Sequence, residues 1–212
     1  MKVEVIPNGR FLENCYLIGD PGRGVCAVVD PGEDAAHIIA RLDALALKPV
    51  AIWLTHAHVD HVAGVGPLVA HTRAPVFLHP ADRPLYDRVV AQAAGFGLRV
   101  DAPPPPDRSF VRGEVLALGD LRIEVRHAPG HSPGSVCLLA EGEDVVFAGD
   151  VLFRESIGRT DLPGGDLDTL LGSIARELLS LPDATVVYSG HGPETTIGHE
   201  RRHNPFLGAR AR

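Results

Sequence analysis

The stretch Trp53-Leu54-Thr55-His56-Ala57-His58-Val59-Asp60-His61 carries three histidines and one aspartate within six residues. It continues an apolar run, Val50 to Leu54, whose length and β-branched residues predict a strand. Functional groups gather at strand ends, because the sheet fixes the backbone while the loop directs the side chains. We therefore predict a metal site at the end of this strand, with the ligands His56, His58, Asp60 and His61.

Three later apolar runs lead to side chains of the same kind. These runs are Ile123 to Val125, Val145 to Phe147 and Val186 to Tyr188. They lead to three further candidate ligands, which are His131, Asp150 and His191. A glycine directly precedes each of these ligands, and it allows the backbone to turn sharply and to approach a metal ion closely.

Imidazoles and carboxylates together suit zinc, iron or manganese. Seven such groups are too many for one tetrahedral ion and fit two ions that share a carboxylate. A lone histidine near a strand end is usually structural or exposed, and a structural zinc site normally uses cysteine and closes with four ligands. No cysteine lies near the cluster in the sequence, so the joint pattern favours a two-metal site. His127 is a weaker candidate that could support a ligand, and the remaining histidines fit surface or helix-end positions.

The rest of the chain alternates short apolar runs with helical patterns, which indicates the α/β class. The main predicted elements are a strand over Val25 to Val29, a helix over Ala35 to Leu47 closed by Lys48-Pro49, and a helix over Leu167 to Leu179 capped by Asp166. Four prolines, Pro103 to Pro106, give the strongest linker signal. We predict one domain over 1–212, in which two halves joined near 101–107 form two sheets packed face to face with helices outside.

Bulk composition restricts the classes of partner. The formal net charge of −7 argues against a general affinity for nucleic acid, which needs a basic surface. No segment approaches the roughly 18–20 apolar residues of a membrane span, and the start has no apolar signal region. Three widely spaced cysteines form neither a disulfide framework nor a metal knuckle. We therefore expect a cytoplasmic protein, and the net charge does not exclude a small anionic substrate held by one or two local arginines.

The motif Thr-His-Ala-His-Val-Asp-His resembles the signature of the metallo-β-lactamase superfamily, and the three later ligands stand where that family places its own. The resemblance covers nearly the whole chain. It implies a four-layer αββα sandwich with two metal ions at one edge. It also implies that His56, His58 and His131 hold one ion, that Asp60, His61 and His191 hold the other, and that Asp150 bridges them. By the same analogy Asp60 accepts a proton from the attacking water, which makes it the predicted catalytic residue.

Within the superfamily the chain looks most like the short bacterial members of the glyoxalase II (hydroxyacylglutathione hydrolase) branch, which lack the C-terminal helical domain. The similar segments are Gly149 to Phe153, Ile157 to Asp161, Gly190 to Thr196 and Glu200 to Leu207. The resemblance implies hydrolysis of a thioester such as S-D-lactoylglutathione, with zinc as the expected metal and iron or manganese as alternatives. Arg159 falls where the family has a basic residue that contacts glutathione, so it is the predicted substrate-binding residue.

Other activities of the same fold stay open. Asp161 stands where the full-length enzymes have a tyrosine, which puts glutathione recognition in question. The segment Gly158-Arg159-Thr160-Asp161 also resembles persulfide dioxygenases, which use one iron ion to oxidise glutathione persulfide. A lactonase or another ester hydrolase ranks lower. A β-lactamase would normally be exported, a nuclease would need a basic face, and a non-catalytic relative would usually have lost ligands. The sequence leaves the oligomeric state open.

Overall fold

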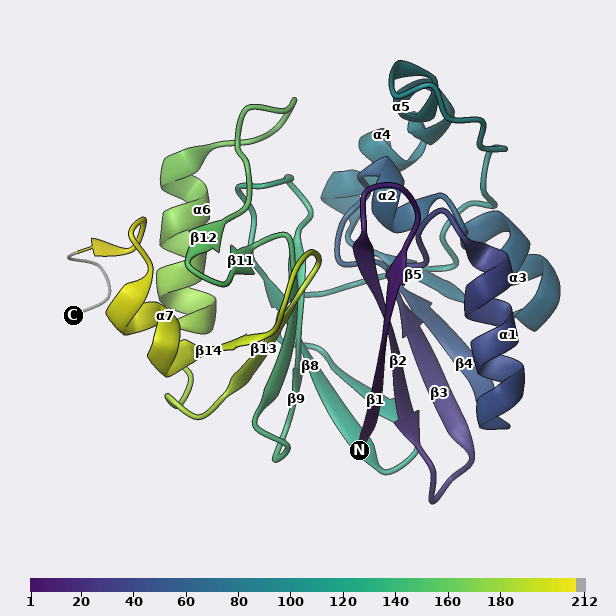
Figure 1. The fold of residues 1–212 in the computed structure, drawn as a ribbon, viewed down its shortest axis with the longest axis horizontal. Coiled ribbons are helices and arrows are strands. Elements are labelled where there is room, and N and C mark those ends of the chain that lie inside the picture. The colour runs from purple at the N-terminus through teal and green to yellow at the C-terminus, as the bar shows by residue number, and fades with distance from the viewer. Residues whose placement is uncertain (209–212) are drawn as a thin grey trace. The chain divides into compact units, whose positions relative to one another are not determined.

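The strands of the N-terminal half form one sheet in the computed structural model, which describes residues 1–208 (Figure 1). The strands lie in the order β1-β2-β3-β4-β5-β6, with bounds β1 (Lys2–Asn8), β2 (Glu13–Asp20), β3 (Val25–Val29), β4 (Lys48–Trp53), β5 (Val76–Leu78) and β6 (Arg108–Ser109). β1, β2 and β3 pair antiparallel, whereas β3 to β6 run parallel. Parallel neighbours need crossover connections, and helices supply those that join β3 to β4 and β4 to β5.

Helices α1 and α3 cover one face of this sheet (Figure 1). The helical segments of this half are α1 (Ala35–Leu45), α2 (Val59–Val62), α3 (Val65–Thr72), the 3-10 turn η1 (Pro80–Asp82), α4 (Arg83–Tyr86) and α5 (Val89–Gly95). Ile38 and Leu42 of α1 and Leu68 of α3 are buried in one core with Val28 and Ile52 of the sheet. Burying each such side chain contributes about 1.5–3 kcal/mol.

The predicted helix from Ala35 is confirmed, but its predicted end is wrong. Ala46 caps the helix in the left-handed conformation, with φ 52°. Lys48 and Pro49 then begin β4 instead of closing the helix. Pro49 lies opposite Cys26, where the register of the β3–β4 pair shifts. The missing N–H of proline is tolerated at such an irregularity.

The C-terminal half forms a second sheet, in the order β14-β13-β10-β9-β8-β7. The strands of this half are β7 (Val115–Leu118), β8 (Leu121–His127), β9 (Val136–Ala140), β10 (Val145–Gly149), β13 (Val186–Ser189) and β14 (Thr195–Thr196), with β11 (Leu152–Phe153) and β12 (Ser156–Ile157) as a separate hairpin. β10 and β13 pair in parallel, and the pairs β8–β9, β9–β10 and β13–β14 are antiparallel.

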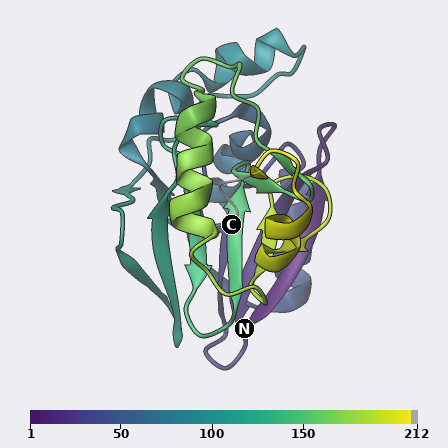
Figure 2. The same ribbon diagram turned by 90° about the vertical axis from the view of Figure 1, so that its left-hand side faces the viewer.

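Helix α6 (Leu167–Ser173) packs on this second sheet, and Figure 2 shows it in front of the strands together with α7 (Ile197–His203). Asp166 caps α6 as predicted, because its side chain accepts a hydrogen bond from Thr169 N at 2.7 Å. The predicted helix continues beyond Ser173, but as a π-helical turn, η2 (Ile174–Leu178). Leu170, Ile174 and Leu178 share a buried core with strands β10 and β13.

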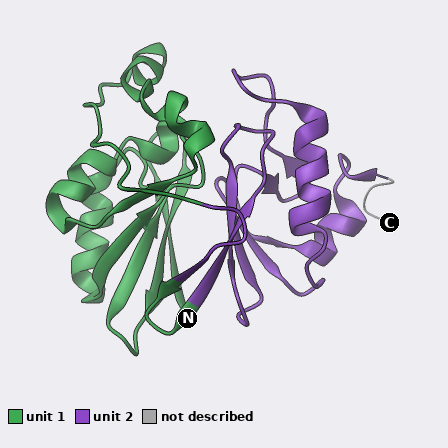
Figure 3. Cartoon of the chain, turned by 180° about the vertical axis from the view of Figure 1, so that it is seen from behind, with its two compact units in different colours: residues 1–110, 117–121 green, residues 111–116, 122–212 purple. Residues whose placement is uncertain are grey.

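The chain divides into two units, drawn green and purple in Figure 3. Unit 1 comprises residues 1–110 and 117–121, and unit 2 comprises 111–116 and the chain from residue 122 onward. The first passage lies at Phe110–Val111, slightly beyond the predicted junction near 101–107. The reason is that Arg108 and Ser109 pair with β5 and so keep the proline run within unit 1.

The α/β class, with helices flanking the sheets, is confirmed. Within residues 1–208, no helix has the length and apolar character that crossing a membrane requires.

Candidate metal centre

The four predicted ligands of unit 1 lie together in the loop after β4 and the one-turn helix α2. His58 is the N-terminal flanking residue of α2, and Asp60 and His61 lie within the helix. The ring of His56 is 4.8 Å from that of His58 and 4.1 Å from that of His61, measured between centroids. His56 and His61 are buried, so each of their ring nitrogens needs a polar partner or an ion.

Asp30, at the end of β3, orients two of these histidines. Its carboxylate accepts hydrogen bonds from Thr55 N at 2.7 Å, from Thr55 Oγ1 at 2.6 Å and from His61 Nδ1 at 3.0 Å. Because the Thr55 hydroxyl donates its one hydrogen to Asp30, it accepts from His56 Nδ1, 3.1 Å away. Both imidazoles therefore carry hydrogen on Nδ1 and keep Nε2 for an ion, the usual arrangement in metal sites.

Asp30, His56 and His61 each offer an atom within 4.8 Å of the others, so they form a group that could hold a metal. The short hydrogen bond from His61 Nδ1 assigns Asp30 a supporting role instead. The sequence analysis missed this residue, which stands in the turn Asp30-Pro31-Gly32. It also missed Asp82, whose buried carboxylate accepts from Ala57 N at 2.9 Å and so fixes the peptide between His56 and His58. For Asp30, an acidic residue directly after the predicted strand Val25 to Val29 was the available signal.

Asp60 and His61 are spaced as two ligands of one ion would be. Oδ2 of Asp60 lies 3.7 Å from Nε2 of His61, which is too long for a hydrogen bond. Two atoms that each lie about 2.0–2.2 Å from a tetrahedral ion are roughly 3.3–3.6 Å apart. The pair therefore fits a shared ion.

Unit 2 brings the other three predicted ligands together. Oδ2 of Asp150 lies 3.6 Å from His131 Nε2 and 3.7 Å from His191 Nε2. Asp150 and His191 follow the parallel strands β10 and β13, which are in register at Gly149 and Ser189. His131 follows β8, across the same sheet. One carboxylate oxygen thus lies near two imidazole nitrogens, at distances longer than a hydrogen bond.

The segment after β12 supports these ligands. His131 Nδ1 donates to the carbonyl oxygen of Arg159 at 2.8 Å, so in the neutral ring Nε2 carries no hydrogen and is the atom that would face an ion. A Cβ on Gly158 would lie 1.9 Å from the carbonyl oxygen of Asp150, so only glycine fits there. Gly130 has φ +130°, and a Cβ on it would lie 2.3 Å from the backbone of Leu170. His127 Nε2 donates a hydrogen bond to the carbonyl oxygen of Pro133 at 2.9 Å.

Arg159 makes a bidentate ion pair with Asp161. Its Nε lies 2.7 Å from Oδ1 and its terminal nitrogen lies 2.8 Å from Oδ2. Hydrogen bonds from Arg159 lower the pKa of Asp161 to about 2, and Asp161 raises the pKa of Arg159 in turn. Both side chains are exposed, at 59% and 68% of their surface. Exposed pairs are weak, so a substrate carboxylate can compete for the guanidinium.

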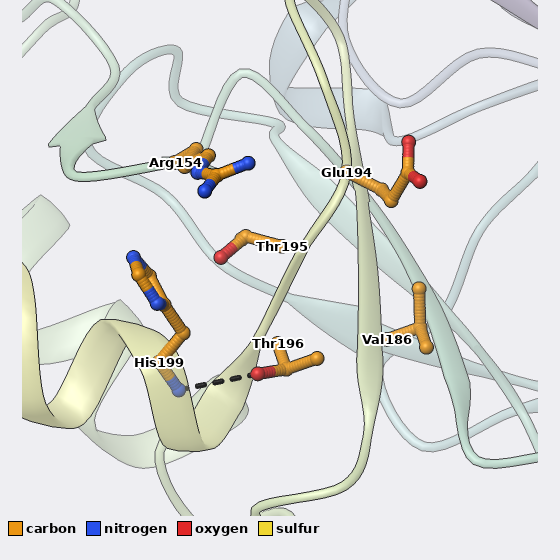
Figure 4. A pocket seen from close by; sticks show the side chains of 6 residues that line it. All are labelled: Arg154, Val186, Glu194, Thr195, Thr196 and His199. Atoms are coloured by element: carbon orange, nitrogen blue, oxygen red, sulfur yellow. Dashed lines mark hydrogen bonds between the residues drawn. The ribbon is translucent and has the colours of Figure 1, made fainter.

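A separate pocket of about 240 Å³ opens on unit 2 beside β14 and α7 (Figure 4). Its lining residues are Arg154, Val186, Glu194, Thr195, Thr196 and His199. It contains none of the seven predicted ligands, although Thr195 follows His191 by only four residues. In Figure 4 the ring of His199 and the hydroxyl of Thr195 point toward the side of the pocket on which Arg154 lies.

The fold and the site define the class of protein. The sequence model of the metallo-beta-lactamase superfamily matches residues 8–191. The chain belongs to this superfamily, a family of metal-dependent hydrolases, and the predicted family and fold are confirmed.

Similar proteins narrow the comparison. The chain is 41% identical to "Hydroxyacylglutathione hydrolase GloC" of Haemophilus influenzae over the whole of both chains. Among solved structures, that of "BLEG-1 B3 metallo-beta-lactamase" is 41% identical, with TM-score 0.92 over 98% of this chain and all of that one. "TTHA1623 in a di-iron-bound form" is 44% identical, with TM-score 0.90 over 97% and 100%. ETHE1 from Myxococcus xanthus is 28% identical, with TM-score 0.83 over 99% and 87%.

Proposed function

We propose that the protein is a two-metal thioester hydrolase. The observation that carries the proposal is the position of Asp150 Oδ2, 3.6 Å from one imidazole nitrogen and 3.7 Å from another. These distances exceed a hydrogen bond and match two ligands on either side of an ion. We infer that this carboxylate oxygen, which faces two such nitrogens, bridges two ions.

The superfamily pattern supports the assignment of the seven ligands. We assign His56, His58 and His131 to one ion, Asp60, His61 and His191 to the other, and Asp150 to both. Four of the seven belong to unit 1 and three to unit 2, so neither unit contains a complete set. We therefore propose that the two units act as one functional domain.

The residues of the chain fit the chemistry of hydrolysis. When bound, the ions would lower the pKa of a water molecule and polarise the substrate carbonyl. We assign to Asp60 the role of accepting the proton of the water, and the 3.7 Å between its Oδ2 and His61 Nε2 supports this assignment. The hydrogen bonds at Nδ1 hold His56, His61 and His131 in one tautomer. Arg159 offers its guanidinium to a substrate carboxylate.

A thioester is the substrate class that fits best. A thiolate leaving group has a pKa of about 8.5 and needs little acid assistance, whereas an amide nitrogen needs a proton as it leaves. The relative named hydroxyacylglutathione hydrolase supports this substrate, with glutathione as the thiol carrier. The similarity to a protein named B3 metallo-β-lactamase makes β-lactams the second candidate.

A substrate panel under anaerobic conditions tests the proposal. The panel contains S-D-lactoylglutathione, an acyl-coenzyme A, a lactone, a β-lactam and glutathione persulfide, with metal content measured on the same sample. We expect thioester cleavage without oxygen and two ions per chain. Oxygen uptake with persulfide, by a sample with one iron ion, would support a persulfide dioxygenase instead, an activity suggested by the Gly158 to Asp161 segment. β-Lactam cleavage without thioester cleavage would overturn the substrate class.

Zinc is the proposed metal, and the di-iron form of a 44% identical protein supports iron as a physiological alternative. We place the reaction in the cytoplasm, where the three unpaired thiols of the chain stay reduced.

A further inference from the structure

Helix α7 contains a buried carboxylate, Glu200, whose side chain is fully hydrogen-bonded. Glu200 is 0% exposed. Its Oε1 accepts from Thr195 Oγ1 at 2.5 Å, and its Oε2 accepts from Glu155 N at 2.9 Å and from Asn204 Nδ2 at 2.7 Å. A buried charge is costly unless every oxygen is satisfied, and here three donors satisfy it.

One of these three bonds, from Glu155 N, holds the turn of the β11–β12 hairpin. Glu155 lies in the hairpin turn in the left-handed conformation, with φ +56°. A non-glycine residue keeps such a conformation only where its surroundings enforce it. Asn204 adds a second contact, because its Nδ2 also donates to the carbonyl oxygen of Ser156 at 3.0 Å. The other strand of the hairpin, β11, is held by Ser189 of β13, whose Oγ donates to the carbonyl oxygen of Leu152 at 2.7 Å.

The hairpin and the residues after it contact all three predicted ligands of unit 2. Phe153 meets the ring of His191 edge-on, at 6.2 Å between centroids. Gly158 lies directly against the backbone of Asp150. The carbonyl oxygen of Arg159 accepts the hydrogen bond from His131 Nδ1. A shift of the hairpin would therefore move the support of each ligand.

Apolar packing already attaches α7 to unit 2, because Ile197 and Leu207 belong to the buried core. Attachment of the helix does not require a buried carboxylate. The hairpin is itself held in this core by Leu152 and Ile157, and the polar contacts of Glu200 and Asn204 add hydrogen bonds to the backbone of its turn and of β12. Arg154 of the hairpin turn and Thr195 also line one pocket, so the hairpin and β14 are neighbours (Figure 4).

We propose that Glu200 and Asn204 are positioning residues that hold the β11–β12 hairpin against His131, Asp150 and His191. The inference rests on the proposed two-metal function. It concerns the geometry and affinity of metal binding, and neither residue touches the substrate.

Cobalt substitution tests the proposal, because the d–d spectrum of cobalt reports coordination geometry independently of turnover. The variants are Glu200→Ala, Glu200→Gln and Asn204→Ala. Glu177→Gln is the matched control, since Glu177 is also a buried and ion-paired carboxylate of unit 2 but no contact links its side chain to the hairpin in the described structure. We expect cobalt affinity to fall about 10- to 100-fold in Glu200→Ala, with an altered spectrum and a lower kcat. KM for a thioester should stay within about twofold, and the control should match the wild type.

Glu200→Gln keeps one acceptor and should recover part of the affinity, while Asn204→Ala, which retains the carboxylate, should show a smaller loss. Asn204→Ala also serves if Glu200→Ala fails to fold. Wild-type affinity and spectrum in both alanine variants would overturn the positioning role and leave the proposed function intact. A wild-type chain that bound no cobalt would refute the two-metal function, and the positioning role with it.

Discussion

At the scale of single residues, three predicted ligands share one arrangement. In each of them Nδ1 donates a hydrogen bond to an oxygen of the protein. The acceptor is the Thr55 hydroxyl for His56, the Asp30 carboxylate for His61 and the Arg159 carbonyl for His131. The tautomer is thereby set before any ion binds, and Nε2 faces the site. Such preorganisation lowers the entropic cost of ordering the imidazole rings when a metal ion binds.

Removing Asp60 or His58 tests the chemistry directly. We expect Asp60→Ala and His58→Ala to lower kcat/KM for a thioester by at least about 100-fold, because each variant removes a ligand and Asp60 also accepts the proton. The far-ultraviolet circular dichroism spectrum should be unchanged, since neither side chain packs in the apolar core. Unchanged turnover, with metal content verified, would refute the assignment.

Substitutions at Arg159 and Asp161 should have opposite effects. Arg159→Ala should raise KM for an anionic thioester about tenfold and change kcat little, because it removes binding that is equal in ground and transition states. Asp161→Asn should lower KM, because it releases the guanidinium from its ion pair. Steady-state kinetics on both variants check this. An unaltered KM in Arg159→Ala would exclude this residue from the substrate site.

At the scale of elements, the π-helical turn η2 carries a pH-dependent contact. Burial raises the pKa of Glu177, but hydrogen bonds from Arg176 and Arg112 outweigh it and leave the pKa below 4.5. A carboxyl group whose pKa is depressed on folding stabilises the protein above its unfolded pKa, and this stabilisation is lost as the pH falls through the folded value. Glu177→Gln should therefore lower the free energy of unfolding by about 1 kcal/mol near neutral pH.

The difference between wild type and Glu177→Gln should shrink below pH 4.5, where the wild-type carboxyl also becomes protonated. Urea titrations at pH 7 and at pH 3.5 measure this difference in the free energy of unfolding. Both titrations contain a chelator, so that metal loss affects the two proteins equally. A difference that stays constant across this range would show that the ion pairs do not stabilise the fold.

Gly158, the residue directly after β12, should tolerate no side chain. An added methyl would meet the carbonyl oxygen of Asp150, so Gly158→Ala must displace a metal ligand or the segment that supports it. We expect a metal content of less than two ions per chain. Gly172→Ala, in α6, is the matched control, because a Cβ there meets nothing within 4 Å. Equal metal content in both variants would contradict the expected clash.

Local patterns explain which elements could be predicted from the sequence. The strands that end in ligands are short apolar runs beside clear turn signals, and the structure confirms them. β2 could not be predicted, because all eight of its residues are buried, Glu13 and Asn14 among them, so it shows no alternation. The contact between Asp30 and His61 spans 31 residues, and no local pattern encodes a pairing over that distance. The seven-ligand arrangement across the units stays a prediction.

At the scale of the whole molecule, the three thiols are protected. Cys15, Cys26 and Cys137 are all buried and free. Burial raises the pKa of each thiol, to about 11 for Cys26. A native sample at pH 8 should therefore react with a thiol reagent at less than one site per chain, and at three sites in denaturant. Rapid modification of the native protein would contradict the buried positions.

The path of the chain between the units has a practical consequence. After its first passage into unit 2 at residue 111, the chain returns to unit 1 over 117–121, where Asp120 pairs with Arg23 at 2.8 Å. A single cut therefore cannot yield two fragments that each correspond to one unit. Cleavage before residue 111 leaves residues 117–121 of unit 1 on the C-terminal fragment. Cleavage after residue 121 leaves residues 111–116 of unit 2 on the N-terminal fragment. Attempts to express either half separately should fail for topological reasons, whatever the strength of its core.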